Sequence, residues 1–171
     1  MRKILLITML LLSFVSAVFA KTPPGYYNVN DENQLKLGGI KLNDTNAQVE
    51  SMYGKPTESY RTKNPVNQPG MLPCYIWDAY YGKTVKLNFI QLVNESKLYV
   101  SRVESTANNG WQTPTGLTVG MKEEEIEKRM GKSYRDNNAY TYNLGSFRLA
   151  FYPKDGVISK IVLVSHDVHR D

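Results

Sequence analysis

Cysteine and histidine are scarce in this sequence, whose 171 residues include one Cys and two His. A single cysteine excludes an internal disulfide, and so few thiol and imidazole groups exclude most metal-binding frameworks. Gly-rich phosphate loops, nucleophile elbows and zinc helices with two His are also missing. We therefore predict no catalytic residues, no bound metal and no cofactor, and we do not expect an enzyme.

An excess of charge of one sign is also missing. After the N-terminal segment described below, 19 Lys and Arg stand against 16 Asp and Glu, a net charge of +3. Nucleic-acid binding requires a clustered basic footprint, so no nucleic-acid partner is predicted. Apolar residues make up 42% of the chain, which is enough to bury a core. Cys74 is expected to be buried as a small apolar side chain, with an intermolecular disulfide as the alternative.

Residues 1–20 have the pattern of a signal peptide. Arg2 and Lys3 precede an apolar run that ends at Val18-Phe19-Ala20, where a signal peptidase requires small residues. The alternative, a membrane anchor, is disfavoured because the run is short for a full span. We expect a secreted or periplasmic protein with no stable membrane anchor after cleavage. Residues 21–38 are then an N-terminal extension.

The rest of the chain contains an internal similarity. Residues 39–60 align with residues 116–137 without a gap, and four positions are identical: Gly39/Gly116, Glu50/Glu127, Gly54/Gly131 and Lys55/Lys132. Further matches continue with a shrinking offset, as expected if length changes fall in connections. The similarity predicts a first repeat over residues 39–105, a linker over 106–115, a second repeat over 116–164 and a tail over 165–171.

Each repeat reads as a short helix followed by three alternating segments. Thr45 and Gln48 form a capping box, and Gly54 ends the first helix. Acidic residues 123–125 start the second helix, which ends at Gly131. The alternating segments are residues 75–81, 84–92, 98–105, 140–144, 146–152 and 157–164. The predicted fold is α+β: two tandem repeats, each a helix plus a three-stranded meander, forming one six-stranded antiparallel sheet with the helices on one face.

Alternation assigns side chains to the two faces of this sheet. One face is apolar and is expected to meet the helices: Tyr75, Trp77, Val85, Leu87, Phe89, Val103, Tyr140, Tyr142, Phe147, Leu149, Phe151, Ile161 and Leu163. The other face is polar, mildly basic and rich in Tyr. A solvated face and a docking surface are both consistent with that composition.

Short motifs in both helices resemble those of known families. Gly120-Met121-Lys122, Ile126 and Gly131 are spaced as in the SmpA/OmlA-type outer-membrane assembly lipoproteins. The tandem arrangement resembles the secreted β-lactamase inhibitor proteins, whose two repeats form one curved sheet. The sequence lacks the lipid-attachment Cys of the first family and the paired Cys of the second.

The resemblance implies a non-enzymatic protein that binds another envelope or extracellular protein through its polar sheet face and hairpin loops. By position, the residues that would contact the partner are Tyr80, Lys86, Asn88, Arg102, Arg148, Tyr152 and Lys160.

Other readings remain open from the sequence. Asp78 and Glu104 are either an acid–base pair or members of a surface ion-pair ladder. His166 and His169 are either metal ligands or part of a solvated tail. Tyr80 and Tyr152 provide a stacking platform if the chain binds a small molecule or a sugar. Residues 61–73 form an irregular, Pro-rich segment that is a second possible contact site. Trp111 is expected to be a buried plug rather than an exposed anchor.

Overall fold

The fold is dominated by one antiparallel sheet. The computed structural model describes residues 31–67 and 72–165, so the predicted signal peptide and both His lie outside the described residues. The helical elements are the 3₁₀ helix η1 (Glu32–Gln34), α1 (Asn46–Tyr53) and α2 (Glu124–Met130). The strands are β1 (Glu58–Arg61), β2 (Cys74–Tyr81), β3 (Val85–Leu92), β4 (Tyr99–Ser105), β5 (Tyr134–Asp136), β6 (Ala139–Leu144), β7 (Phe147–Lys154) and β8 (Val157–Ser165). None of the described helices has the length and apolar character needed to span a membrane.

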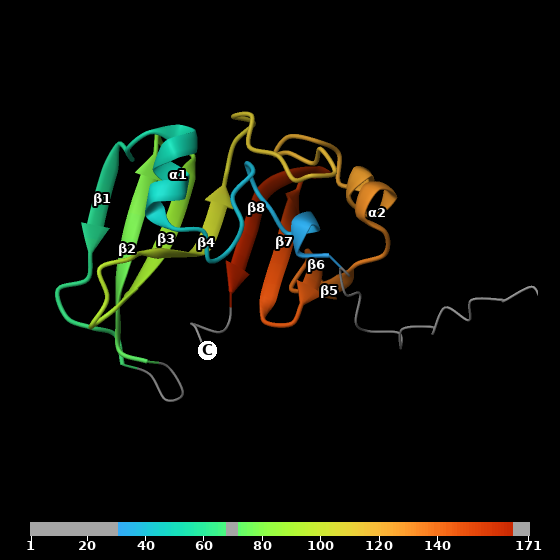
Figure 1. Ribbon diagram of the computed structural model, residues 1–171. Coiled ribbons are helices and arrows are strands. Elements are labelled where there is room, and N and C mark those ends of the chain that lie inside the picture. The colour runs from blue at the N-terminus through green and yellow to red at the C-terminus, as the bar shows by residue number, and fades with distance from the viewer. Residues whose placement is uncertain (1–30, 68–71, 166–171) are drawn as a thin grey trace, which may run out of the picture.

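Within the described ranges the sheet has eight strands, in the order β1-β2-β3-β4-β8-β7-β6-β5 (Figure 1). The chain therefore enters at one edge, reaches the centre at β4, and builds the other half inward from the opposite edge. The two halves meet where β4 pairs with β8, with Val103 opposite Leu163. Both of these side chains are fully buried, so the apolar layer continues across the junction.

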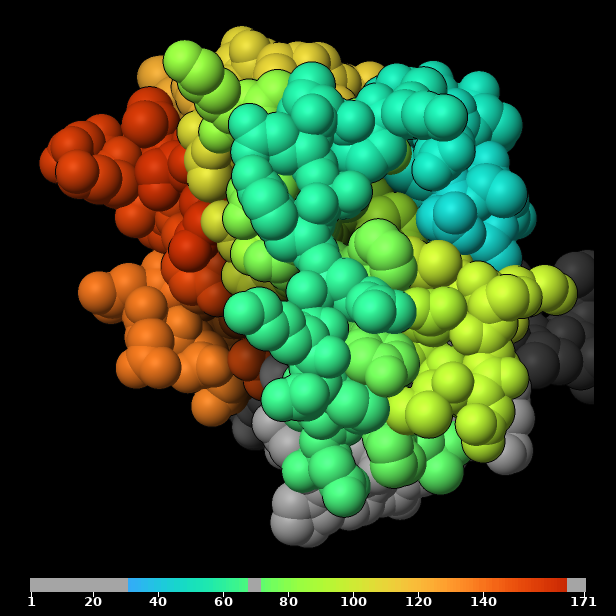
Figure 2. Space-filling model, turned by 90° about the vertical axis from the view of Figure 1, so that its left-hand side faces the viewer, coloured from blue at the N-terminus to red at the C-terminus, as the bar shows by residue number. Residues whose placement is uncertain are grey.

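The predicted architecture of two helix-plus-three-strand units, with helices covering one face of a six-stranded sheet, was wrong. β1 and β5 were not predicted, and they add one strand to each edge. Neither strand has an apolar alternation: all four residues of β1 are exposed, and β5 has only three residues. Figure 2 shows the edge of the molecule formed by β1, with β1 and α1, in blue-green, nearest the viewer.

The helices do not form a layer over the sheet. Each of them buries a single side chain, Val49 in α1 and Ile126 in α2. Residues 35–42 cover much of the rest of the apolar sheet face. Their side chains Leu35, Leu37 and Ile40 are at most 2% exposed. Part of the predicted N-terminal extension therefore belongs to the core.

Several local predictions were confirmed. All six predicted strands are present, with ends shifted by at most two residues. In the capping box of α1, the Thr45 amide donates to Gln48 Oε1 at 2.7 Å, and the Gln48 amide donates to Thr45 Oγ1 at 3.3 Å. Gly54 and Gly131 end the helices with φ of 75° and 82°. These signals act over a few residues and do not depend on how the strands assemble.

The buried residues confirm most of the predicted apolar face; Trp77 and Phe147 are partly buried against it, and Tyr75 is outside the core cluster. Leu87, Phe89, Val103, Leu149, Phe151, Ile161 and Leu163 are all at most 4% exposed and belong to one cluster. Trp111 is also buried, as predicted, and its ring stacks on that of Tyr53 with 4.4 Å between centroids. Cys74 is buried and forms no disulfide within the described residues. Burial raises the pKa of its thiol, so a smaller fraction of it is present as the reactive thiolate.

Candidate functional site

The seven residues predicted to contact a partner all lie on the side of the sheet opposite the core. We call this side the outer sheet face. Residues opposite each other in neighbouring strands point to the same side, and the pairs include Tyr80↔Lys86, Asn88↔Arg102 and Tyr152↔Lys160. Across the junction, Val164 pairs with both Arg102 and Arg148, so the two halves share this face.

The side chains on the outer sheet face form rows that cross the strands. The first row is Tyr60, Asp78, Asn88, Arg102, Val164, Arg148 and Asn143. The second row is Glu58, Tyr80, Lys86, Glu104, Val162, Ala150, Thr141 and Tyr134. Tyr152 and Lys160 begin a third row. The three rows span about 13 Å along the strands, at roughly 3.3 Å per residue.

Ion pairs balance most of the charge on this face. Lys86 Nζ lies 2.7 Å from Asp78 Oδ2, and Arg102 Nη2 lies 2.6 Å from Glu104 Oε2. The hydrogen bond to Asp78 raises the pKa of Lys86 above its ordinary value. The three rows together carry four cations and three carboxylates, so the outer sheet face is polar and nearly neutral, with a small excess of positive charge.

Lys160 differs from the other cations. In the described part of the chain it has no carboxylate partner, and its Nζ lies 4.4 Å from the centroid of the Tyr152 ring. A cation over an aromatic ring keeps its charge available to a further anionic or polar group. The Lys160 ammonium group, above the Tyr152 ring, is therefore the cation of the outer sheet face that can most readily bind a group of a partner.

The arrangement of Asp78 and Glu104 fits an ion-pair ladder rather than an acid–base pair. Asp78 lies on β2 in the first row and Glu104 on β4 in the second, with β3 between them. Each carboxylate contacts a different cation, and Asn88 also donates to Asp78. In the described ranges no three His, Cys, Asp or Glu side chains converge as metal ligands would.

Tyr80 and Tyr152 do not form one stacking platform. Four strand spacings separate β2 from β7, or about 19 Å at roughly 4.8 Å each. A hollow of about 160 Å³ at Tyr80 is lined mainly by the β2–β3 hairpin and the end of β4, and Tyr152 is not part of it. A sugar ring therefore cannot stack on both rings at once.

Residues 61–73 are not wholly irregular. Arg61 ends β1, and its guanidinium carbon lies 4.6 Å from the centroid of the Tyr75 ring. Val66 and Cys74 exchange backbone hydrogen bonds of 2.7 and 3.1 Å. The described part of this segment, residues 61–67, therefore extends the sheet edge beside Cys74, and the role of the segment as a contact site stays a prediction.

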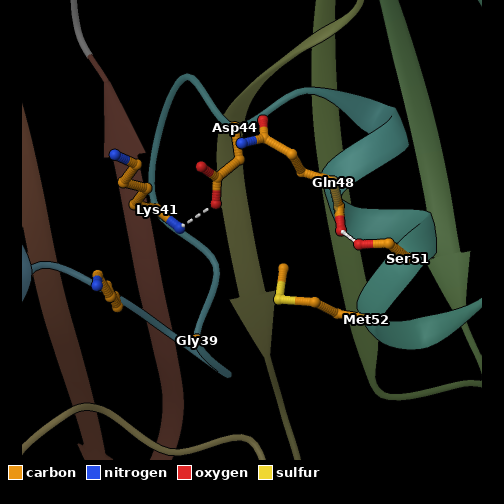
Figure 3. Close-up of a pocket in the computed structure, with 7 residues that line it drawn as sticks. Gly39, Lys41, Asp44, Gln48, Ser51 and Met52 are labelled. Atoms are coloured by element: carbon orange, nitrogen blue, oxygen red, sulfur yellow. Dashed lines mark hydrogen bonds between the residues drawn. The ribbon is translucent and has the colours of Figure 1, made fainter.

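A second hollow, not predicted from the sequence, lies beside α1 (Figure 3). It has a volume of about 280 Å³ and is lined by Lys36, Gly39, Lys41, Asp44, Gln48, Ser51 and Met52. Asp44 Oδ2 accepts from the Lys41 amide at 3.0 Å, and Ser51 Oγ donates to the Gln48 carbonyl at 2.7 Å. Because these groups already bond locally, we interpret the hollow as the capped end of α1 rather than a ligand site.

In the described ranges, the outer sheet face holds two buried polar atoms without a hydrogen-bond partner, Thr141 Oγ1 and Arg148 Nε. Thr141 is 1% exposed, and its row neighbours Ala150 and Val162 are 1% and 2% exposed. These short side chains lie between rows that carry longer ones. Burial and missing partners depend on the assembled sheet, so no signal in the sequence could have identified these two atoms.

Thr141→Val is expected to increase the free energy of unfolding by about 1 kcal/mol, because it removes an unsatisfied buried hydroxyl without changing the side-chain shape. Thr113→Val is the matched control. Thr113 is 2% exposed, but its Oγ1 accepts from the Leu117 amide at 3.1 Å. The control should lose about 1–3 kcal/mol because it leaves that amide unpaired. Urea denaturation measures both values, and a loss of stability in Thr141→Val would contradict the assignment.

Comparisons of the chain with protein-family models, curated proteins and solved structures found no match.

Proposed function

We propose that this chain is an exported, non-enzymatic module that binds another envelope or extracellular protein through the outer sheet face and adjoining hairpins. The observation that carries the proposal is the position of the seven predicted residues. They come from β2, β3, β4, β7 and β8, yet all lie on one face that crosses the junction between the halves.

The chemistry of this face favours a protein partner. Tyr and Arg are enriched in protein interfaces because they combine contact area with hydrogen bonding. Tyr60 and Tyr80 pack edge to face near the β1 edge, and Lys160 lies over the Tyr152 ring on β7 and β8 in the other half of the sheet. The near neutrality of the face disfavours a strongly charged partner such as a nucleic acid.

The outer sheet face alone is too small for a stable interface, so the adjoining hairpins must contribute to it. Eight strands are separated by seven spacings of roughly 4.8 Å, so the three rows of side chains cover a plane of about 34 by 13 Å, or about 440 Å². A stable interface buries about 800 Å² on each partner. The β2–β3 hairpin, which contributes Lys83 and Thr84 beside Tyr80, is placed to supply part of the difference.

A capture experiment tests the proposal. The tagged chain, the double variant Tyr152→Ala/Lys160→Glu and the control Lys128→Glu are incubated with proteins of the envelope and culture medium. Lys128 is exposed on α2, away from the outer sheet face. Mass spectrometry should find a protein whose recovery falls by about tenfold or more with the double variant and is unchanged by the control. Equal recovery of every captured protein by all three chains would overturn the proposal.

A further inference from the structure

The guanidinium of Arg148 is only partly committed to contacts within the chain. Its Nη1 lies 3.4 Å from Asp136 Oδ2, which is long for a charge-assisted hydrogen bond. Arg102, on the same face, reaches Glu104 at 2.6 Å. Among the residues that the structure describes, Arg148 Nε has no hydrogen-bond partner. Nε and Nη2 lie on the same edge of a guanidinium. Because Nε is buried, this edge can bind a further group only after the side chain turns.

Thr141 supplies a second group at the same place. It lies on β6 opposite Ala150, while Arg148 on β7 lies opposite Asn143, so the two residues are diagonal neighbours. Such neighbours are about 7–8 Å apart, within reach of a long side chain. The Thr141 hydroxyl is buried and has no partner. Two polar groups that require hydrogen bonds therefore occur side by side on the outer sheet face.

We propose that Arg148 and Thr141 bind a carboxylate from an acidic side chain of the protein partner. This inference rests on the proposed function, because it assigns the chemistry of one part of the same face. The Nε–Nη2 edge matches the two oxygens of a carboxylate and binds them with two parallel hydrogen bonds. The Thr141 hydroxyl donates to one of those oxygens. Arg148 reaches this position by turning its outer side-chain torsions and giving up the long contact with Asp136.

The local charges favour a carboxylate over a phosphate. Asp136 lies beside Arg148, and the cations Arg102 and Lys86 already have carboxylate partners. A phosphate group, with a charge approaching −2, would meet one uncommitted guanidinium beside a fixed negative charge. A single negative charge with two oxygens in a plane fits one guanidinium edge.

NMR of the full chain tests the proposal with a hexaglutamate peptide as the probe. The Nε–H resonance of Arg148 is expected to shift and to saturate during the titration, whereas a hexaglutamine peptide should leave it unchanged. Arg148→Lys keeps the positive charge but removes the guanidinium edge, and it should weaken peptide binding by about tenfold. Thr141→Val should weaken binding less. Arg129→Lys, on α2 outside the outer sheet face and at a guanidinium already paired with Glu125 at 3.0 Å, is the matched control and should bind normally.

Three outcomes would overturn the proposal: no shift of the Arg148 resonance, equal weakening in Arg129→Lys, or acetate binding as tightly as the peptide. The last result would assign the site to small free carboxylates. Capture of the protein partner separates this inference from the proposed function. If Arg148→Lys captures the partner normally while Tyr152→Ala/Lys160→Glu does not, the carboxylate site is wrong and the partner-binding face stands.

Discussion

Trp111→Ala is expected to lower the free energy of unfolding by about 3–5 kcal/mol, a large share of the stability of a domain this size. Trp111 is 7% exposed, stacks on Tyr53 and has its ring centroid 6.4 Å from that of Tyr81. Alanine leaves a cavity between α1, β2 and the segment around Gly38. Because these elements belong to different parts of the chain, they cannot close the cavity without breaking other contacts.

Trp111→Phe is the control for this prediction. Phenylalanine keeps a ring against Tyr53 and should cost less than half as much as alanine. Urea denaturation followed by circular dichroism measures both variants. A loss below about 1 kcal/mol in Trp111→Ala would show that the ring is not a buried plug and would contradict the packing described for this end of the sheet.

Gly38→Ala is expected to destabilise the chain by about 2–5 kcal/mol, from two separate costs. Gly38 has a φ of 63°, a left-handed conformation that costs alanine about 1–2 kcal/mol. A Cβ at this position would lie 2.5 Å from Trp111 Cε3 and 2.7 Å from Cδ2. The ring is held by its stack on Tyr53, so forcing it aside adds about 1–3 kcal/mol.

The neighbouring Gly39 separates these two costs. Its φ is 77°, but a Cβ there would meet nothing within 4 Å. Gly39→Ala should therefore show the backbone cost alone, about 1–2 kcal/mol. The difference between the two variants in urea denaturation isolates the steric contribution of the Trp111 ring. Equal losses in both variants would mean that the ring moves freely, which contradicts its role as a plug.

The sequence predicts those parts of the fold that depend on neighbouring residues. Val85, Leu87 and Phe89 alternate with polar residues, so the position and the faces of β3 follow from the period of a strand. Thr45 and Gln48 are three residues apart, so the start of α1 follows from the capping box. The same alternation places Lys86 and Asn88 on the outer sheet face, and for this reason the membership of that face could be predicted.

What the sequence missed depends on the assembled sheet. β1 is held by backbone pairing with β2, in which Tyr60 lies opposite Asp78, and its exposed side chains leave no apolar pattern. The pairing of β4 with β8 joins residues about 60 positions apart, as in Val103↔Leu163, and nothing local encodes it. The orphaned atoms of Thr141 and Arg148 arise from burial by several strands at once.

Contact between a partner protein and the outer sheet face is the central claim, and photo-crosslinking tests this contact most directly. Two variants of the protein are made, one with a benzophenone amino acid at position 152 on this face and the other with it at position 52. Met52 is 48% exposed on α1, outside the rows of the outer sheet face, and serves as the matched site. We predict that irradiation in the presence of envelope and extracellular proteins gives a discrete adduct from position 152 and none from position 52. Adducts from position 52 without any from position 152 would contradict the account.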